Sequence, residues 1–462
     1  GAEVGADGYR RAAVSVGGPA GTDVRYALNG HVTEDGDAVP GNDFRAHGVS
    51  GKVEASLPAA AAGVVFRYVE ADSESFPEDS GGPELAVIRA TDERDIREAH
   101  VGSYLEVPLG DAWQLNLAGS VYDRQADERS PGIAAGVFSP VPPNGADTDF
   151  RRSLVNANAE FSPLESARFL IGAEWQREKG ESSGFLDIGF PLPTDFLLER
   201  DTQSVFAEGQ LRLGDFSAMA TLRHDNPDGE DSETTAGAGI VYQLPDRGLS
   251  LRANWGQAFK LPSFFALAHP VVGNPNLVSE TGTSIDVGGS LQLERWSTVL
   301  SLSVYRNEFE NLVDFDPVLF TNVNRSEVTT RGAELAVSSE PLPSLALTAH
   351  LTYAEADIEQ SDSRLRSRPR WRGGASALWT LNDAWQLSVN ALAIDEFFDS
   401  SVPTGGLFVD GYVRFDAAAT VQMAERWELT AAIDNLTDAD YEEAIGFPAA
   451  GIRPRLSLRY DF

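Results

Sequence analysis

The chain has 462 residues, of which 42% are hydrophobic, and it contains no cysteine. With 70 acidic against 36 basic residues its formal net charge is −34, and a field of that sign disfavours binding to nucleic acid. No apolar run reaches the roughly 18 residues that a transmembrane helix needs, whereas strands that cross a membrane need only about 9–11 residues with every second one apolar.

Apolar and polar residues alternate along most of the chain, beginning with a first expected strand over about 1–8. In one segment Trp113, Leu115 and Leu117 share one face, and Gln114 and Asn116 share the other. The same period of two returns at 249–255, 300–304, 385–391, 427–434 and 456–462. This period predicts strands with one apolar and one polar face. In a membrane barrel the apolar face contacts lipid and the polar face lines the lumen.

The connections between these segments alternate between short and long. Short ones are expected at 110–111, 245–248, 341–343, 382–383 and 425–426. Long ones are expected at about 72–94, 125–148, 180–200, 258–279, 358–366 and 399–408. Tryptophans at 113, 296, 385 and 427 stand beside short turns, which is typical of an aromatic girdle at a membrane interface. We therefore predict a 22-stranded antiparallel transmembrane β-barrel with short periplasmic turns and long extracellular loops.

Two groups of polar residues are candidates for binding. Carboxylates between strands could hold calcium, which prefers several oxygen ligands: Asp35, Asp37, Asp43, Asp72 and Glu74. The simpler interpretation is that they are solvated acidic loops or an adaptation to a salty medium. Arg364, Arg366, Arg368, Arg370 and Arg372 fall at every second position, so in an extended segment all five would share one face. They could contact an anionic ligand, a plug or lipopolysaccharide phosphates, or they could only balance charge.

Catalytic chemistry finds little support in the sequence. The six histidines are scattered without metal-ligand spacing, and no Ser/His/Asp arrangement stands out. His269 lies in an expected long loop, where it could contact a ligand or simply be solvated. We predict that the protein is not an enzyme and that it has no certain cofactor besides possible calcium in the loops.

Three spaced motifs resemble the TonB-dependent outer-membrane receptors. The close of the chain runs from Ile433 through Asn435, Leu436 and Tyr441 to a strand that contains Tyr460 and ends at Phe462. The segment 255–264, followed by 273–277 and 280–281, resembles the mid-barrel stretch of that family. The segments 305–313, 322–323 and 331–335 resemble its next hairpin. The resemblance is strongest over about 250–462, and its terminal residues imply a role in membrane insertion.

The resemblance implies a bacterial outer-membrane barrel that takes up a scarce nutrient, such as a ferric siderophore or cobalamin, as a small-molecule ligand. Its further partners would be outer-membrane lipid, lipopolysaccharide and, through a plug, TonB-ExbB-ExbD. The family's plug domain and TonB box do not occur in residues 1–462, so we expect one barrel domain there. The plug would be another polypeptide or missing from this sequence. Alternatively, a plugless barrel would serve as a structural or pore component of a larger cell-envelope complex.

Overall fold

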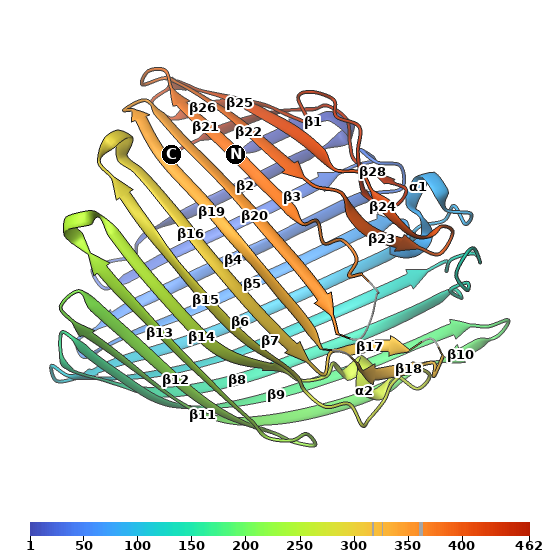
Figure 1. Cartoon of the computed structure of the whole chain (residues 1–462), viewed down its shortest axis with the longest axis horizontal. Helices are drawn as coiled ribbons and strands as arrows, with labels where there is room; N and C mark the ends of the chain where they lie inside the picture. Colours follow the sequence, from blue (N-terminus) through green and yellow to red (C-terminus); the bar gives the residue numbers. More distant parts are fainter. Residues whose placement is uncertain (317, 326, 360–363) are drawn as a thin grey trace.

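Strands of the computed structural model close into one antiparallel barrel, which Figure 1 shows from the side. The structure describes residues 1–316, 318–325, 327–359 and 364–462. The first half of the wall consists of β1 Ala2–Gly5, β2 Arg10–Pro19, β3 Val24–Asp35, β4 Asp43–Leu57, β5 Ala60–Ser75, β6 Asp92–Leu109, β7 Trp113–Ser130, β8 Asn144–Leu164, β9 Ala167–Asp187, β11 Phe196–Leu213 and β12 Phe216–Pro227. The second half consists of β13 Glu233–Leu244, β14 Leu249–Lys260, β15 Glu280–Leu293, β16 Thr298–Glu310, β19 Val328–Leu342, β20 Leu345–Ile358, β21 Trp371–Thr380, β22 Trp385–Ile394, β25 Tyr412–Ala424, β26 Trp427–Asp434 and β29 Arg453–Tyr460.

The remaining strands and the two short α-helices gather at one end of the barrel, here called the loop end, on the right of Figure 1. They are β10 Pro191–Pro193, the hairpins β17–β18 (Val313–Asp316 and Thr321–Asn324), β23–β24 (Phe397–Ser401 and Gly405–Val409) and β27–β28 (Glu442–Ala444 and Phe447–Pro448), and the short helices α1 Gly82–Leu85 and α2 Phe264–Ala268. Short turns connect the strands at the opposite end, here called the turn end. No helix among the described residues is long and apolar enough to cross a membrane.

The barrel closes where the last strand pairs with the first. β29 runs antiparallel to β1, with Val4 opposite Leu456, and β1 pairs in turn with β2. The sheet contains 23 strands, one of which, β10, pairs only with β9 beyond the wall, so the barrel itself has 22 strands, as predicted. Closure satisfies the backbone hydrogen bonds that an open sheet edge would leave unpaired in lipid. The first strand ends at Gly5, earlier than expected, because 6–8 form a turn with Asp7 at a φ of 55°.

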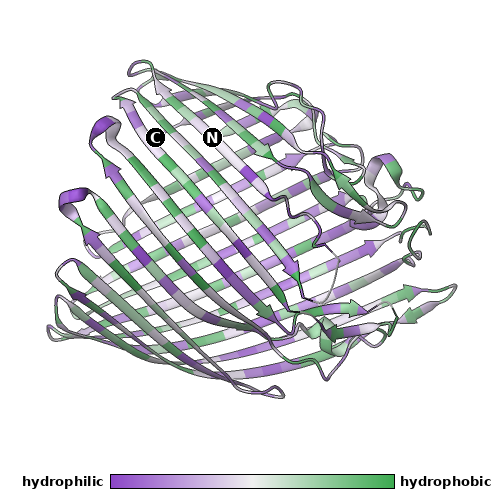
Figure 2. Ribbon diagram, viewed as in Figure 1, coloured by the Kyte–Doolittle hydropathy of each residue, from purple (hydrophilic) through white to green (hydrophobic). Residues whose placement is uncertain are grey.

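Alternation along each strand gives the wall two chemically different faces, and Figure 2 shows the resulting stripes of hydropathy. Val14, Val101 and Ile171 are among the apolar side chains that lie exposed on the outside, where they would contact lipid. Asn116 and Asn158, which point inward, are hydrogen-bonded to each other across β7 and β8. The predicted faces of 113–121 are confirmed.

The wall is much taller on one side than on the other. Strands β8 and β9 each have 21 residues, whereas β21 and β22 each have 10. The loops expected at 72–94, 125–148 and 180–200 are therefore wrong in extent, since strands continue into both ends of each and leave only 76–91, 131–143 and 188–195 between the wall strands. Beyond the lipid both faces of a strand are solvated, so the apolar alternation that marks a strand in the sequence disappears. Of the loop expected at 358–366, residues 360–363 lie outside the described part.

Aromatic side chains mark the turn end of the wall. Trp113 at the start of β7 stacks on Phe161 of β8 with ring centroids 4.4 Å apart. Trp427 at the start of β26 lies 4.7 Å from Tyr460 of β29. Both pairs are on the outward face beside short turns, and Trp385 begins β22 in the same way. This arrangement is that of an interfacial girdle.

Candidate functional site

The inward face of the wall carries a chain of hydrogen-bonded side chains from β7 to β9. It begins near the turn end, where Gln114 Nε2 donates to Asn116 Oδ1 at 2.8 Å and Asn116 Nδ2 donates to Asn158 Oδ1 at 2.9 Å. Asn158 donates in turn to Asn156 at 3.1 Å, and Asn156 donates to Glu174 Oε2 at 3.1 Å. These linked amides line the lumen with oriented donors and acceptors, which suit a hydrated polar solute or polypeptide surface.

This row of hydrogen bonds continues from Glu174 of β9 into a partly buried ion cluster on β11 and β12. Arg223 Nη2 donates to Glu174 Oε1 at 2.8 Å, and Arg223 Nε donates to Asp225 Oδ1 at 2.9 Å. Ser204 Oγ donates to the same oxygen of Asp225 at 2.6 Å. Asp225 is only 2% exposed, and the guanidinium of Arg223 is the counter-charge that its carboxylate contacts.

The connection 261–279 folds inward from β14 and packs on β9 and β11. Arg200 Nη2 donates to Glu178 Oε2 at 2.8 Å, and Arg200 Nη1 donates to the carbonyl of Pro262 at 3.2 Å. The ring of Phe264 covers Gly180 so closely that a Cβ there would lie 2.4 Å from Phe264 Cδ2. The loop therefore crosses over β12 and β13 on the lumen side and narrows the mouth of the barrel.

His269 closes the same connection rather than projecting into open solvent. Its Nδ1 accepts hydrogen bonds from the backbone amides of Val271 at 3.3 Å and Val272 at 3.2 Å, which requires a neutral ring with Nδ1 unprotonated. Burial lowers the pKa of His269 and so favours this form. Contact of His269 with a ligand stays a prediction.

The described residues of the neighbouring connection 311–327 are tied to this loop by asparagine side chains. Asn274 Nδ2 donates to the carbonyl of Asn322 at 2.9 Å, and Asn322 Nδ2 donates to the carbonyl of Val272 at 2.8 Å. Asn324 Nδ2 also donates to the carbonyl of Val278 at 3.0 Å. The two connections thus form one block of structure at the mouth.

The expectation that five arginines share one face is wrong, because the segment that holds them is not extended throughout. Ser367 has a φ of 53°, and the turn around it breaks the alternation. Arg366 binds Asp79 and Asp399, whereas Arg372 lies on the inward face of β21. The other three differ in surroundings: Arg364 lies over the ring of Phe408, Arg368 is exposed, and Arg370 approaches Glu355 at 3.8 Å.

The five carboxylates expected to bind calcium are not brought together. Asp35 faces the lumen and binds Arg453, while Asp37 lies in the connection after β3. Asp43, Asp72 and Glu74 lie on the outward face of β4 and β5, with Asp43 opposite Glu74 and Asp72 opposite Arg45. Within the described residues no three acidic or histidine side chains converge to hold a metal ion. Calcium binding by these residues stays a prediction.

The motif near the end of the chain builds the connection between β26 and β29. Asn435 is 2% exposed, with a φ of 50°, and its Oδ1 accepts from the amide of Ala439 at 2.8 Å. Its Nδ2 donates to the carbonyls of Ala439 at 2.9 Å and Ala450 at 3.2 Å. Tyr441 stacks on Tyr412 with ring centroids 3.9 Å apart. Leu436, in contrast, is 43% exposed.

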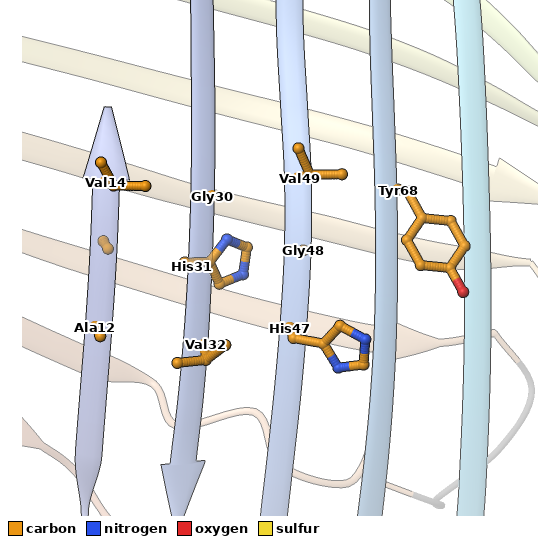
Figure 3. A pocket seen from close by; sticks show the side chains of 10 residues that line it. Ala12, Val14, Gly30, His31, Val32, His47, Gly48, Val49 and Tyr68 are labelled. Carbon is orange, nitrogen blue, oxygen red and sulfur yellow. The ribbon is translucent and has the colours of Figure 1, made fainter. Parts of the chain in front are cut away.

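A cavity of about 490 Å³ lies beside this motif at the loop end. Its lining includes Asp35 and Arg453, which bind each other, together with Arg414, Asp434 and Tyr441. A second hollow, of about 480 Å³ and shown in Figure 3, lies between Val14, Val32, Val49 and Tyr68 around the side-chain-free Gly30. Those apolar side chains lie on the outward face, so this hollow would contact lipid. The cavity beside Tyr441 and Arg414, in contrast, lies within reach of a solute at the mouth.

Sequence reasoning did not find Arg200, Arg223, Asp225 or Asp399. Each of them acquires its role from a partner on another strand or loop, and alternation in the sequence only indicates which face an unpaired residue occupies. A charged residue on the inward face was the available signal for the first three. Asp399, in an expected loop, had no such signal.

Comparison with known proteins identifies relatives of this barrel. Residues 28–436 match the family model of the TonB dependent receptor-like β-barrel. The vitamin B12 transporter BtuB of Photobacterium profundum is 24% identical over 314 residues, which cover 64% of this chain and 48% of that protein. BtuB of Vibrio vulnificus is 29% identical over 259 residues, which cover 53% of this chain and 39% of that protein. The chain thus spans about half the length of the curated relatives it matches.

Solved structures show the same fold. The ferric-catecholate import receptor Fiu of E. coli K12 superimposes with a TM-score of 0.81 at 16% identity, covering 100% of this chain and 81% of that one. The ferripyoverdine receptor of Pseudomonas aeruginosa, bound to ferripyoverdine, gives a TM-score of 0.82 at 15% identity. The superposition covers 100% of this chain and 71% of that receptor. At such identities the likeness concerns the fold alone.

Proposed function

The chain belongs to the TonB-dependent receptor family and lies in the bacterial outer membrane, and from that premise we propose that it forms the barrel of a nutrient transporter. The ligand would be a scarce small molecule such as a ferric siderophore or cobalamin. The curated relatives are named as vitamin B12 transporters, and structural neighbours are receptors for ferric chelates. These names describe the relatives, and they supply the candidates to be tried on this protein.

The polar inward wall is the observation that carries this proposal. A 22-stranded barrel is too wide for its own side chains to fill. The hydrogen-bonded row from Gln114 to Glu174 and the ions beyond it leave a hydrated surface along the height of the wall. We propose that a plug polypeptide occupies this lumen and receives energy from TonB-ExbB-ExbD, while lipid and lipopolysaccharide surround the outward face.

At the loop end, the proposed ligand would meet the structured connections rather than an open pore. The block formed by 261–279 and 311–327 and the cavity near Tyr441 and Arg414 are the surfaces available to it. The inward Arg372 and the exposed Arg368 add positive charge near the mouth, which would favour an anionic chelate over a neutral ligand.

Uptake by cells tests the proposal. The full-length gene would be expressed in a strain that lacks its own siderophore and cobalamin receptors, with and without TonB. Accumulation of labelled cobalamin or of a ferric siderophore that requires both the gene and TonB would support transport. Absence of TonB-dependent uptake across the panel, with a stable complex of larger envelope proteins on purification, would favour the alternative of a structural or pore component.

A further inference from the structure

Four connections at the loop end meet in one packed assembly. They are 76–91, 131–143, 395–411 and 435–452, and Arg366 reaches into them from the connection between β20 and β21. In barrel order their flanking strands extend from β22 to β8, and the short connections 6–9 and 36–42 lie between them. Figure 1 shows β23, β24, β28 and α1 near one another on the right, below β1 and to the right of β3.

A buried carboxylate lies at the centre of this assembly. Asp399 is 2% exposed, and its Oδ1 accepts from Arg366 Nε at 2.8 Å while its Oδ2 accepts from the amide of Ile445 at 3.1 Å. Arg366 Nη1 also donates to Asp79 Oδ1 at 2.7 Å. One guanidinium therefore joins three connections that are far apart in the sequence. Burial opposes the charge of Asp399, but Arg366 and the backbone amides outweigh it and lower the pKa of this carboxyl.

Backbone contacts join the same connections independently of the ions. The amide of Val402 donates to the carbonyl of Asp79 at 2.8 Å, and the carbonyl of Val402 accepts from the amide of Phe138 at 3.1 Å. Phe397, Val409 and Ile445 form a small hydrophobic core beneath them. Such a core is what allows a loop assembly to hold a fixed shape.

The backbones also approach too closely to slide past one another. A Cβ on Gly136 would lie 2.5 Å from Pro403 Cα, and one on Gly82 would lie 2.4 Å from the carbonyl oxygen of Gly446. Movement of one connection would thus break its packing with the next. Contacts of this kind are expected in a permanent structure rather than in loops that open and close separately.

We propose that these four connections and Arg366 form a fixed strap across one side of the mouth, so that the ligand reaches the lumen only past the opposite loop block, 261–279 with 311–327. The fixed shape of the strap follows from the contacts alone, whereas its effect on the ligand rests on the proposed function. Arg366 and Asp399 act as positioning residues, since they hold other connections in place.

Hydrogen–deuterium exchange on the full-length protein tests the strap without any ligand. Asp399→Asn removes the charge that Arg366 binds, and Asp410→Asn changes an exposed acid just after the same hairpin as a control. The strap predicts that D399N speeds amide exchange by about tenfold or more in 76–91 and 131–143, which Asp399 does not touch, while D410N changes neither. Faster exchange confined to 395–411 and 435–452 would overturn the strap as one unit.

A disulfide then tests whether the strap moves during transport. A Cβ on Gly405 would lie 3.6 Å from Val137 Cβ, within the roughly 3.5–4.5 Å found in disulfides, and the chain has no cysteine of its own. Because the φ of 70° at Gly405 strains any side chain there, the reduced variant and not the wild type is the reference. We expect the oxidised V137C/G405C protein to take up ligand within about twofold of its reduced form. Uptake lost on oxidation and regained on reduction would overturn the fixed strap. Lack of uptake by the wild type would contradict only the proposed function, because the exchange experiment would still decide the inference.

Discussion

The guanidinium of Arg200 lies over the ring of Phe264, with its Cζ atom 4.9 Å from the ring centroid. Arg200 is on β11, and Phe264 begins the short helix in the connection after β14. The pair joins the connection 261–279 to the barrel wall, because Arg200 is itself bound to Glu178 of β9. Removal of either partner should therefore release the loop without opening the barrel.

Phe264→Ala should loosen 261–279. Phe264 is only 8% exposed, so the substitution leaves a gap above Gly180. It also removes the contact between the ring and the guanidinium of Arg200. Limited proteolysis after Lys260, compared with the wild type in the same detergent, should show faster cleavage. Phe265→Ala is the matched control, since that ring is 52% exposed, and equal cleavage of the two variants would refute the anchor.

The same connection should respond to acid through His269. Its pKa is lowered from the ordinary 6.5 by burial, so protonation favours the opened loop. The closed loop is fully stable above pH 6.5, and that stability is lost as the pH falls through the lowered pKa, when a proton on Nδ1 displaces the amides of Val271 and Val272. Amide exchange of those two residues, corrected for its intrinsic pH dependence, should rise in acid.

His269→Asn provides the control for this pH effect. The amide oxygen of asparagine can accept from the same backbone groups but does not titrate. Protection of Val271 and Val272 should then remain constant across the acidic range. An acid-induced rise in exchange that persists in H269N would assign the effect to other groups.

The sequence allowed the barrel to be predicted because lipid imposes a regular pattern. At Trp113, Leu115 and Leu117 every second side chain had to be apolar, and the short turns returned the chain at regular intervals. The heights of the strands could not be predicted in the same way. Asp123, Asp127 and Arg129 belong to β7 although they show no apolar alternation, since above the membrane nothing selects an apolar face.

The contacts at the mouth could not be predicted because they form between residues that are far apart in the sequence. Arg366 and Asp79 are 287 residues apart, and neither belongs to a recurring motif that would indicate the other. The spacing of the five arginines predicted that their side chains share one face, but the turn at Ser367 places them on different sides of the segment. Asn435 was identified from the resemblance, but its buried amide bonds required the folded connection.

Arg223→Met should destabilise the barrel strongly. The substitution leaves the Asp225 carboxylate, which is 2% exposed, without the guanidinium that compensates its charge, and Glu174 loses a donor as well. Asp225 is buried whereas the Arg223 side chain is 36% exposed, so we expect a loss of about 2–3 kcal/mol, below the roughly 3–5 kcal/mol of a pair buried on both sides. Urea unfolding in lipid vesicles, followed by tryptophan fluorescence, would measure the loss.

Arg252→Met is the comparison for this prediction. Arg252 also faces the lumen, but its side chain is 45% exposed and its nearest carboxylate, on Asp286, is 3.8 Å away. A partly solvated pair of this kind contributes about 0–1 kcal/mol, so the variant should unfold close to the wild type. Similar losses for R223M and R252M would show that burial of Asp225 does not set the cost.

Two substitutions at Asn435 should separate its hydrogen bonds from its backbone conformation. Asn435→Gly removes the amide that binds Ala439 and Ala450 but tolerates the φ of 50°, and it should cost about 1–3 kcal/mol. Asn435→Ala adds the strain of a left-handed backbone, about 1–2 kcal/mol more, so it should unfold at the lower temperature. Loss of the β-sheet circular dichroism signal on heating would rank the melting temperatures of the two variants. Leu436→Ala, at a neighbouring residue that is 43% exposed, is the control and should melt close to the wild type. Equal melting of N435G and N435A would mean that the left-handed turn carries no cost, and a wild-type-like N435G would mean that the buried amide does not hold this connection together.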